Sequence, residues 1–276
     1  MKMKRSEKLG MLTGLVVGVL LLLISVFMIF QTTCKVWGAE KPANATQQGI
    51  DVSSHQGKID WEQVKNSALA DYAIIRCGYG VNQTDKDDKY WDYNSSECER
   101  LGIPYGTYLY SGADTTAKAK SEAEHVVRLL QGKNLTYPIY YDMEADMLNQ
   151  LSSTQIGNIA KTFLNTMESY GYKNVAVYSN KYLFETKLTA SVFSDYPKWI
   201  AQHSNKCTYR GSYHMWQYST QGVIPGISEK VDLNYKIGNW TYAGYSSAKK
   251  TVVVKPKATT IKSLKKSGKK AIKITY

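Results

Sequence analysis

The feature that most constrains the fold is a regular alternation of short strand-like segments with longer helical ones. Eight segments rich in Val, Ile, Tyr and Trp have the length and composition of β-strands. They occupy residues 49–53, 72–76, 105–110, 138–142, 175–178, 198–202, 214–218 and 231–234. Helical segments separate the first five, at residues 61–69, 87–101, 116–130 and 154–170. This alternation is typical of parallel strands joined by right-handed crossovers.

The connections after the fifth strand have a different character. Residues 180–197, 203–212 and 219–230 lack clear helical periodicity. We therefore predict an α/β fold, an irregular TIM-like (β/α)5β3 barrel whose last three strands are joined mainly by loops. An open doubly wound sheet is the alternative, but no glycine-rich phosphate loop follows the first strand.

The N-terminus combines a basic flank with an uncharged apolar stretch at residues 11–30. At 1.5 Å per residue these 20 residues form a helix of about 30 Å, the thickness of a hydrocarbon core. A secretory signal has a shorter apolar core, so we predict one transmembrane signal anchor, with a cleaved signal peptide as the alternative. Because the positive flank stays in the cytoplasm, everything after residue 31 is exported in both cases. We expect a single-pass cell-membrane protein with an extracytoplasmic domain, or a secreted one.

The net charge of +12 is concentrated at the two ends of the chain. Six Lys or Arg precede residue 47 and ten Lys follow residue 248, whereas the residues between carry 19 basic and 21 acidic side chains. Nucleic-acid binding needs basic residues clustered on a folded face. We therefore expect no nucleic acid as a partner.

The composition shifts divide the chain into five parts. They are a cytoplasmic basic segment, the membrane segment, a linker, the barrel and a basic C-terminal segment, at residues 1–10, 11–30, 31–46, 47–242 and 243–276. The last part resembles the first two strands of a fibronectin type III module. Two strands cannot bury a core, so this piece is either truncated or disordered.

The cysteines and histidines show no metal-binding pattern. Cys34, Cys77, Cys98 and Cys207 have no paired CxxC spacing, so we expect no zinc site. We expect buried free thiols, with a Cys77–Cys98 disulfide as the alternative in an exported protein. The histidines form no HExxH or similar motif, and we expect neither a metal nor a cofactor.

Acidic residues lie at the ends of predicted strands, where parallel barrels carry their active sites. Asp51 lies late in the first strand, Asp142 and Glu144 close the fourth, and Asp232 lies in the eighth. Residues two apart in a strand share a face, so Asp142 and Glu144 project to one side and Met143 to the other. Repulsion between close carboxylates raises the pKa of at least one and keeps a proton available near neutral pH. Cleavage of a glycosidic bond requires such a donor, although a lone Asp more often caps a helix or forms a turn.

Aromatic side chains at or near strand ends provide flat surfaces for stacking on sugars. Together with one amide they form a candidate substrate-binding set: Tyr79, Tyr110, Tyr140, Tyr178, Trp199, Gln202 and Trp216. Some of these must belong to the core, and we expect about half of the aromatic ones to touch no ligand.

Six motifs occur in a fixed order along the central domain. They are Gly49 to Trp61, Ala73 to Arg76 with Gly78 to Gly80, Asp142-x-Glu144, Trp199 to Ala201, Trp216 to Tyr218, and Val231 to Asn234. This ordered set resembles the family 25 glycoside hydrolases, the muramidases often called Chalaropsis-type lysozymes. The resemblance covers about residues 47–242, and six motifs in order are far more specific than any one of them.

The resemblance implies a barrel that hydrolyses the β-1,4 bond between N-acetylmuramic acid and N-acetylglucosamine in peptidoglycan. It implies that Glu144 is the general acid and that Asp142 orients the substrate acetamido group, which attacks the anomeric carbon. Asp51 and Asp232 would line the subsite, and a direct nucleophilic role for either stays open. The expected partner is a peptidoglycan glycan strand, bound by a monomer. A non-catalytic peptidoglycan-binding module is the alternative, but a pure binder has little use for a cluster of like charges.

Overall fold

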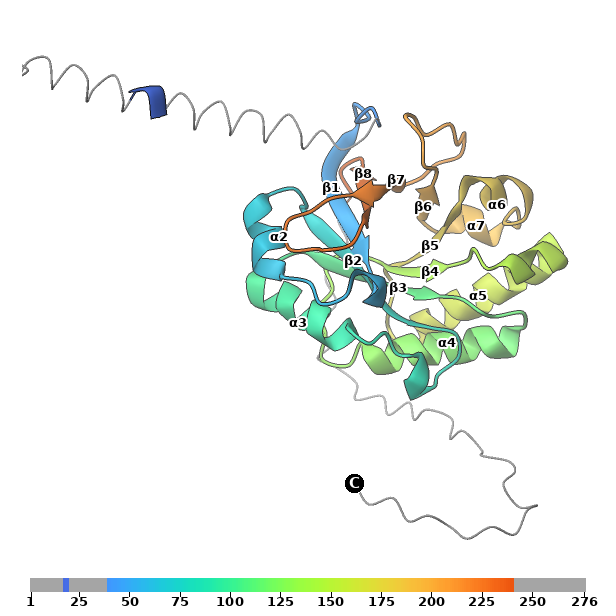
Figure 1. Cartoon of the computed structure of the whole chain (residues 1–276). Helices are drawn as coiled ribbons and strands as arrows, with labels where there is room; N and C mark the ends of the chain where they lie inside the picture. Colours follow the sequence, from blue (N-terminus) through green and yellow to red (C-terminus); the bar gives the residue numbers. More distant parts are fainter. Residues whose placement is uncertain (1–16, 20–38, 241–276) are drawn as a thin grey trace, which may run out of the picture.

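A computed structural model describes residues 17–19 and 39–240 (Figure 1). Within these residues, eight strands form a closed barrel in sequence order. The strands are β1 (Ala45–Val52), β2 (Tyr72–Tyr79), β3 (Tyr105–Tyr110), β4 (Ile139–Asp142), β5 (Val175–Asn180), β6 (Lys198–Ala201), β7 (Met215–Gly222) and β8 (Val231–Ile237). All eight predicted strands are confirmed, and closure of the ring excludes the open doubly wound sheet.

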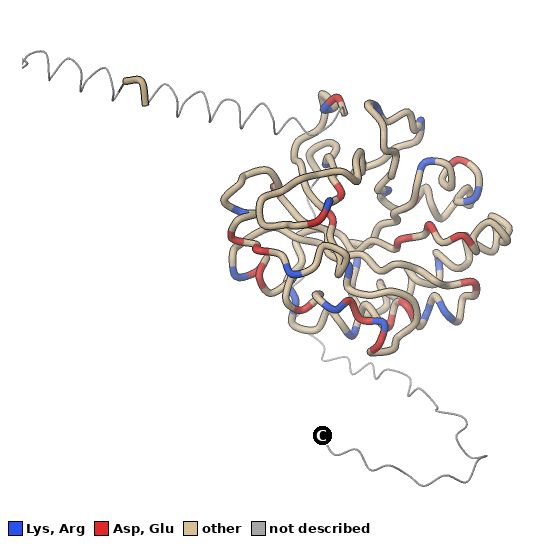
Figure 2. Tube along the Cα trace, in the orientation of Figure 1, with Lys and Arg blue, Asp and Glu red and all other residues tan. Residues whose placement is uncertain are grey.

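Helices cover the outside of the barrel (Figure 1). The four predicted helical segments are confirmed as α2 (Trp61–Ser67), α3 (Trp91–Leu101), α4 (Thr116–Leu129) and α5 (Ser153–Ser169). The longest, α5, begins at a capping box formed by Ser152 and Gln155, which satisfies two of its free N–H groups. Figure 2 shows Lys and Arg interspersed with Asp and Glu along these outer elements.

Short helices also occupy connections in which no helix was predicted. Between β5 and β6 lie α6 (Lys181–Thr186) and α7 (Val192–Asp195). Asn180 caps α6 by accepting a hydrogen bond from the Leu183 N–H at 2.9 Å. The prediction of loops was wrong here because helices of six and four residues are too short to show apolar periodicity. Three 3-10 turns follow β1, β2 and β4: η1 (Ser54–Gln56), η2 (Thr84–Lys86) and η3 (Asp146–Gln150).

The last strand runs in the opposite direction to the others. Strands β1 to β7 pair in parallel, whereas β8 is antiparallel to both β7 and β1. A strand that opposes its neighbours begins at the edge where they end. Asp232, the second residue of β8, therefore pairs with Asp51 near the end of β1. A parallel β8 would have carried Asp232 to the far end of the barrel.

Strand side chains alternate between the barrel interior and the layer beneath the helices. On β6, Trp199 faces the interior beside Tyr140, whereas Ile200 belongs to the outer layer. On β4, Tyr141 points outward and stacks on Phe163 of α5, with ring centroids 3.8 Å apart. The barrel interior is therefore a packed core, and it opens only near the ends of the strands.

Several predictions concern the ends of the chain. Among the described residues, no helix has the length and hydropathy needed to cross a membrane. Apart from residues 17–19, the predicted span at 11–30 lies outside the described residues, as do Cys34 and the C-terminal segment at 243–276. Cys77, Cys98 and Cys207 are free, so the Cys77–Cys98 disulfide is not formed. Burial raises the pKa of the Cys77 thiol to about 12.

Candidate active site

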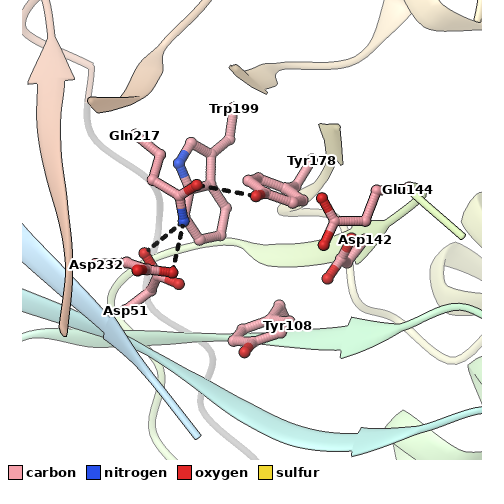
Figure 3. A pocket seen from close by; sticks show the side chains of 8 residues that line it. All are labelled: Asp51, Tyr108, Asp142, Glu144, Tyr178, Trp199, Gln217 and Asp232. Carbon is pink, nitrogen blue, oxygen red and sulfur yellow. Dashed lines mark hydrogen bonds between the residues drawn. The ribbon is translucent and has the colours of Figure 1, made fainter. Parts of the chain in front are cut away.

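The four acidic residues predicted from the sequence meet in one pocket at the edge where β1 to β7 end. Asp51 comes from β1, Asp142 ends β4, Glu144 follows two residues later, and Asp232 begins β8. The other lining residues are Tyr108, Tyr178, Trp199 and Gln217. In Figure 3, Asp51 and Asp232 lie on one side of the pocket, and Asp142 and Glu144 on the other. The free volume is about 60 Å³, which holds a few water molecules and fits the reacting part of a ligand rather than a whole oligosaccharide.

Strand geometry carries Glu144 beyond the end of β4. Met143 is buried in the outer layer, so the residues on either side of it face the pocket. The Met143 N–H donates to the Tyr178 carbonyl at 2.9 Å, and Ser179 Oγ donates to the Met143 carbonyl at 2.6 Å. These bonds hold the segment extended beside β5. Asp142 and Glu144 are thereby brought together, as their spacing predicts.

Two amide side chains hold the pair Asp51 and Asp232. Gln217 Nε2 donates to Asp51 Oδ2 at 3.0 Å and to Asp232 Oδ2 at 3.2 Å. Asn234 Nδ2 donates to Asp51 Oδ2 at 2.7 Å. The Asn234 Oδ1 atom accepts a hydrogen bond from Trp199 Nε1 at 2.8 Å. The network therefore fixes both the carboxylate pair and the indole ring beside it.

Gln217 is buried and uses its full hydrogen-bonding capacity. Its Oε1 accepts hydrogen bonds from the Tyr178 hydroxyl at 3.0 Å and from His203 Nε2 at 3.0 Å. These donors fix which end of the amide carries oxygen, so the NH₂ group must face the carboxylates. His203 must then carry its proton on Nε2 in this arrangement.

Asp142 has a carboxylate oxygen without a partner. Within the described residues no donor reaches its Oδ1, although the side chain is buried. Arg76 offsets part of the charge; its Nε donates to Asp88 Oδ2 at 2.8 Å and its Nη2 to Ser54 Oγ at 2.9 Å. A buried acceptor that lacks a hydrogen bond is costly. A ligand N–H that reached this oxygen would satisfy it.

The pair Asp142 and Glu144 is arranged to retain a proton. Burial raises the pKa of Asp142 well above its usual value, and repulsion from Glu144 and Asp51 raises it further. Burial also raises the pKa of Glu144, and repulsion from Asp51 adds to this, while Tyr178 and His203 oppose it. Glu144 is half-buried, so it remains accessible from the mouth of the pocket.

The pair Asp51 and Asp232 is shifted in the same direction. Burial and then repulsion from Asp232 raise the pKa of Asp51, while the bonds from Asn234 and Gln217 oppose the increase. Burial raises the pKa of Asp232 to about 6; a hydrogen bond with Asp51 lowers it and repulsion from Glu144 raises it. Two carboxyls in contact titrate as a unit, so this pair keeps a shared proton at a pH where exposed aspartates are ionised.

Two of the seven predicted substrate-binding side chains, Tyr178 and Trp199, line the pocket. Tyr110 ends β3 and is half-buried; burial and the nearby acids of the pocket raise its pKa, so it lies beside the acids. Tyr79 ends β2 and is 37% exposed. Both tyrosines are accessible at the rim of the barrel.

Two other members of that set are core residues, which corrects the prediction. Tyr140 is buried beneath Trp199, with ring centroids 4.9 Å apart. Trp216 is fully buried in the outer layer, because strand alternation turns its neighbour Gln217 inward and Trp216 outward. The Trp216 indole donates to the Gln202 carbonyl at 2.8 Å. Neither ring can stack on a sugar.

Gln202 is half-buried and its amide is engaged within a loop. Its Nε2 donates to Thr208 Oγ1 at 3.0 Å, and its Oε1 accepts from the Thr208 N–H at 2.8 Å. The side chain therefore closes the loop from residue 202 to 208. A contact of Gln202 with substrate stays a prediction.

Three residues of the site were not predicted from the sequence: Tyr108, Gln217 and Asn234. A signal for them exists in the strand pattern. Gln217 lies between two aromatic residues in β7, and Asn234 lies two positions after Asp232 in β8. A buried amide needs hydrogen-bond partners, so an amide within an otherwise apolar strand marks a polar network.

The arrangement suits proton transfer better than metal chemistry. Among the residues that the structure describes, no group of three or more His, Cys, Asp or Glu has the geometry to hold a metal ion. The pocket instead offers carboxyl groups with raised pKa values beside hydroxyl and amide donors. A partly accessible, protonated carboxyl can act as a general acid toward a leaving oxygen.

Comparison with known proteins identifies the chain. The family model described as glycosyl hydrolases family 25 matches residues 50–227. The autolytic lysozyme of Clostridium acetobutylicum is 30% identical over 188 residues, which cover 68% of this chain and 55% of that protein. Lysozyme M1 of Streptomyces globisporus is 28% identical over 201 residues, which cover 68% of this chain and 66% of that protein.

Solved structures agree in fold. The modular autolysin LytC of Streptococcus pneumoniae, solved with a synthetic peptidoglycan ligand, superposes with a TM-score of 0.62 at 33% identity, over 68% of this chain and 46% of that one. A family 25 glycosyl hydrolase of Bacillus anthracis gives a TM-score of 0.63 at 21% identity, over 73% and 94%. This chain spans about half the length of LytC and of the clostridial lysozyme. Because the family model covers well over half of it, the chain belongs to glycosyl hydrolase family 25 and is a glycoside hydrolase of the lysozyme type.

Proposed function

We propose that this enzyme cleaves the β-1,4 bond between N-acetylmuramic acid and N-acetylglucosamine in peptidoglycan, with Glu144 as the general acid. The observation that carries this is the position of Glu144. It is half-buried at the mouth of the pocket, and burial and repulsion from Asp51 raise its pKa. A carboxyl that keeps its proton near neutral pH and remains accessible can protonate the leaving oxygen.

Asp142 is proposed to orient the acetamido group of the substrate. Its Oδ1 is buried and lacks a donor, so an acetamido N–H is a suitable partner. A carboxylate that accepts this hydrogen polarises the acetamido group and turns its oxygen toward the anomeric carbon. Attack from within the substrate followed by hydrolysis gives retention of configuration, a variation on the two-carboxylate scheme.

Asp51 and Asp232 are proposed to hold the sugar and to tune the charge of the other pair. Asp51 Oδ2 accepts hydrogen bonds from both Gln217 and Asn234, which favours a fixed, supporting role over nucleophilic attack. Asp232 is only half-buried and is the better placed of the two to contact a ligand. All eight lining residues come from one chain, so we propose that the enzyme acts as a monomer.

We also propose that the enzyme works outside the cytoplasm, anchored in the membrane through residues 11–30. The length of this apolar stretch and the basic residues before it support an anchor. The full-length protein should remain in the membrane pellet after extraction with alkaline carbonate. Recovery in the culture medium with a new N-terminus would instead indicate a cleaved signal.

The activity is tested directly by incubating the full-length protein with purified peptidoglycan. A muramidase releases fragments with reducing N-acetylmuramic acid ends, which mass spectrometry identifies. Fragments ending in reducing N-acetylglucosamine would overturn the proposed bond. Pelleting with the wall without release of any fragment would leave the non-catalytic binding module as the better account.

Tyr178→Phe provides a test through pH dependence. The Tyr178 hydroxyl lowers the pKa of Glu144, so its removal raises that pKa and keeps the general acid protonated to higher pH. We expect the alkaline limb of the kcat/KM profile to move upward by about 1 pH unit, the equivalent of one hydrogen bond to a charged group at about 1.4 kcal/mol. Tyr182→Phe is the matched control, because Tyr182 is exposed and does not line the pocket. A downward shift in Tyr178→Phe would contradict the assignment of Glu144.

A further inference from the structure

A second cleft lies outside the barrel wall, where α6, α7 and residues 209–212 meet the start of β6. It has a free volume of about 280 Å³, close to the lower end of the range for small-molecule sites. It shares no lining residue with the acidic pocket. Trp199 and Lys198 are neighbours on β6, and strand alternation turns Trp199 into the barrel and Lys198 outward into this cleft.

Lys198 is an unusual residue to find in such a cleft. It is 8% exposed, and in the part of the chain that the structure describes no hydrogen bond or ion pair is formed by its ammonium group. Burial lowers its pKa, and the exposed Asp195 on α7 opposes this from beyond ion-pair distance. A buried charge without a partner destabilises a fold. An anion that entered the cleft would supply the missing partner.

The remaining walls of the cleft are mainly apolar. Phe184, Leu188 and Phe193 are almost fully buried, and Tyr209 packs against Phe184 with ring centroids 6.0 Å apart. Ser212 adds a hydroxyl group. An apolar cleft with one buried charge and a few polar groups is the usual composition of a small-molecule site.

We propose that this cleft binds a carboxylate attached to a short aliphatic group, such as the C-terminus of a small peptide, with Lys198 as the counterion. The single cation matches the single charge of a carboxylate. A phosphate monoester carries a charge of about −1.5 to −2 and would require further donors. Such carboxylates occur on the stem peptides of cell walls and on free peptides.

The first experiment measures protection of Lys198 in the wild-type, full-length protein. Lysines are acetylated with a limiting amount of reagent, with and without N-acetyl-D-alanyl-D-alanine, and the extent at each lysine is read by peptide mass spectrometry. We expect saturating dipeptide to slow acetylation of Lys198 at least fivefold. Lys161, an exposed lysine on α5, is the internal control and should react at the same rate in both samples.

Two further ligands test the chemistry of the site. The dipeptide amide lacks the carboxylate and should give no protection, and acetate lacks the aliphatic group and should protect far more weakly. Equal protection by the amide and the acid would overturn the proposal, as would absence of protection by the dipeptide or protection by acetate at the same concentration.

A variant separates binding from folding. Lys198→Met keeps the apolar stem and removes the charge, and it should abolish the increase in melting temperature that the dipeptide gives in the wild type. Lys161→Met should retain that increase. An undiminished increase in a folded Lys198→Met protein would overturn the role of Lys198.

The source of the carboxylate can be distinguished with the same assay. Tighter protection by a disaccharide-peptide fragment than by the free dipeptide would assign the site to the cell wall, and equal protection would assign it to free peptides; either result supports a carboxylate site. Because the two clefts share no residue, a Glu144→Gln protein should give the same protection. This outcome is therefore independent of the proposed muramidase activity.

Discussion

Replacement of Glu144 by Gln is expected to lower kcat on peptidoglycan by about 10²- to 10⁴-fold, the usual contribution of a positioned general acid. Gln has nearly the same shape as a protonated Glu and can still donate a hydrogen bond, but it cannot transfer a proton to the leaving oxygen. KM should change little, because binding does not require the transfer. The measurement is the initial rate of release of reducing ends at saturating peptidoglycan.

Two comparisons make this result specific. Asp146→Asn removes an exposed acidic side chain that begins η3 and does not line the pocket, and its kcat should remain within about twofold of the wild type. An aryl glycoside leaves without the help of an acid, so Glu144→Gln should regain most of its activity on such a substrate. If Glu144→Gln instead keeps the wild-type kcat on peptidoglycan, Glu144 is not the acid.

The fold was predictable where the chain repeats one unit. The four helices between β1 and β5 are long enough to show apolar periodicity, and the strands they connect are short, apolar and separated by caps such as Ser152. The helices α6 and α7 were not predictable, because four to six residues complete too few turns. The direction of β8 was also not predictable, because it depends on how the ring closes rather than on any local pattern.

The candidate site shows the same division. Asp142 and Glu144 were found because their spacing of two residues places both on one face of an extended segment. Asp232 was found as an acid in the eighth strand, but it reaches the pocket only because β8 runs antiparallel. The proposal that Trp216 binds substrate failed because proximity to a strand end does not reveal which face a side chain occupies. The neighbouring Gln217 was overlooked although a buried amide in that strand requires partners.

Asp142→Asn is the second replacement with a large expected effect. Asn retains the size of the side chain but loses the negative charge that polarises the acetamido group, and it can present an NH₂ group where an acceptor is needed. We expect kcat to fall by about 10²- to 10³-fold, comparable to the loss of one oriented group that stabilises developing charge. The aryl glycoside should not restore activity, because the defect lies in the attack on the anomeric carbon rather than in departure of the leaving group. Full recovery on that substrate would contradict the proposed role.

The stability of Asp142→Asn provides an independent check with the opposite sign. Burial and repulsion from Glu144 raise the pKa of Asp142 in the folded state, so ionisation of this group destabilises the fold once the pH exceeds the usual aspartate value near 3.9. A neutral Asn removes that penalty. At pH 7 the variant should therefore unfold at a denaturant concentration equal to or higher than the wild type, and the difference should vanish at about pH 3, where both forms are neutral at this position. A protein that loses activity while it gains stability indicates that the carboxylate is retained for its chemistry, whereas a large loss of stability at pH 7 would mean that Asp142 acts mainly as a structural residue.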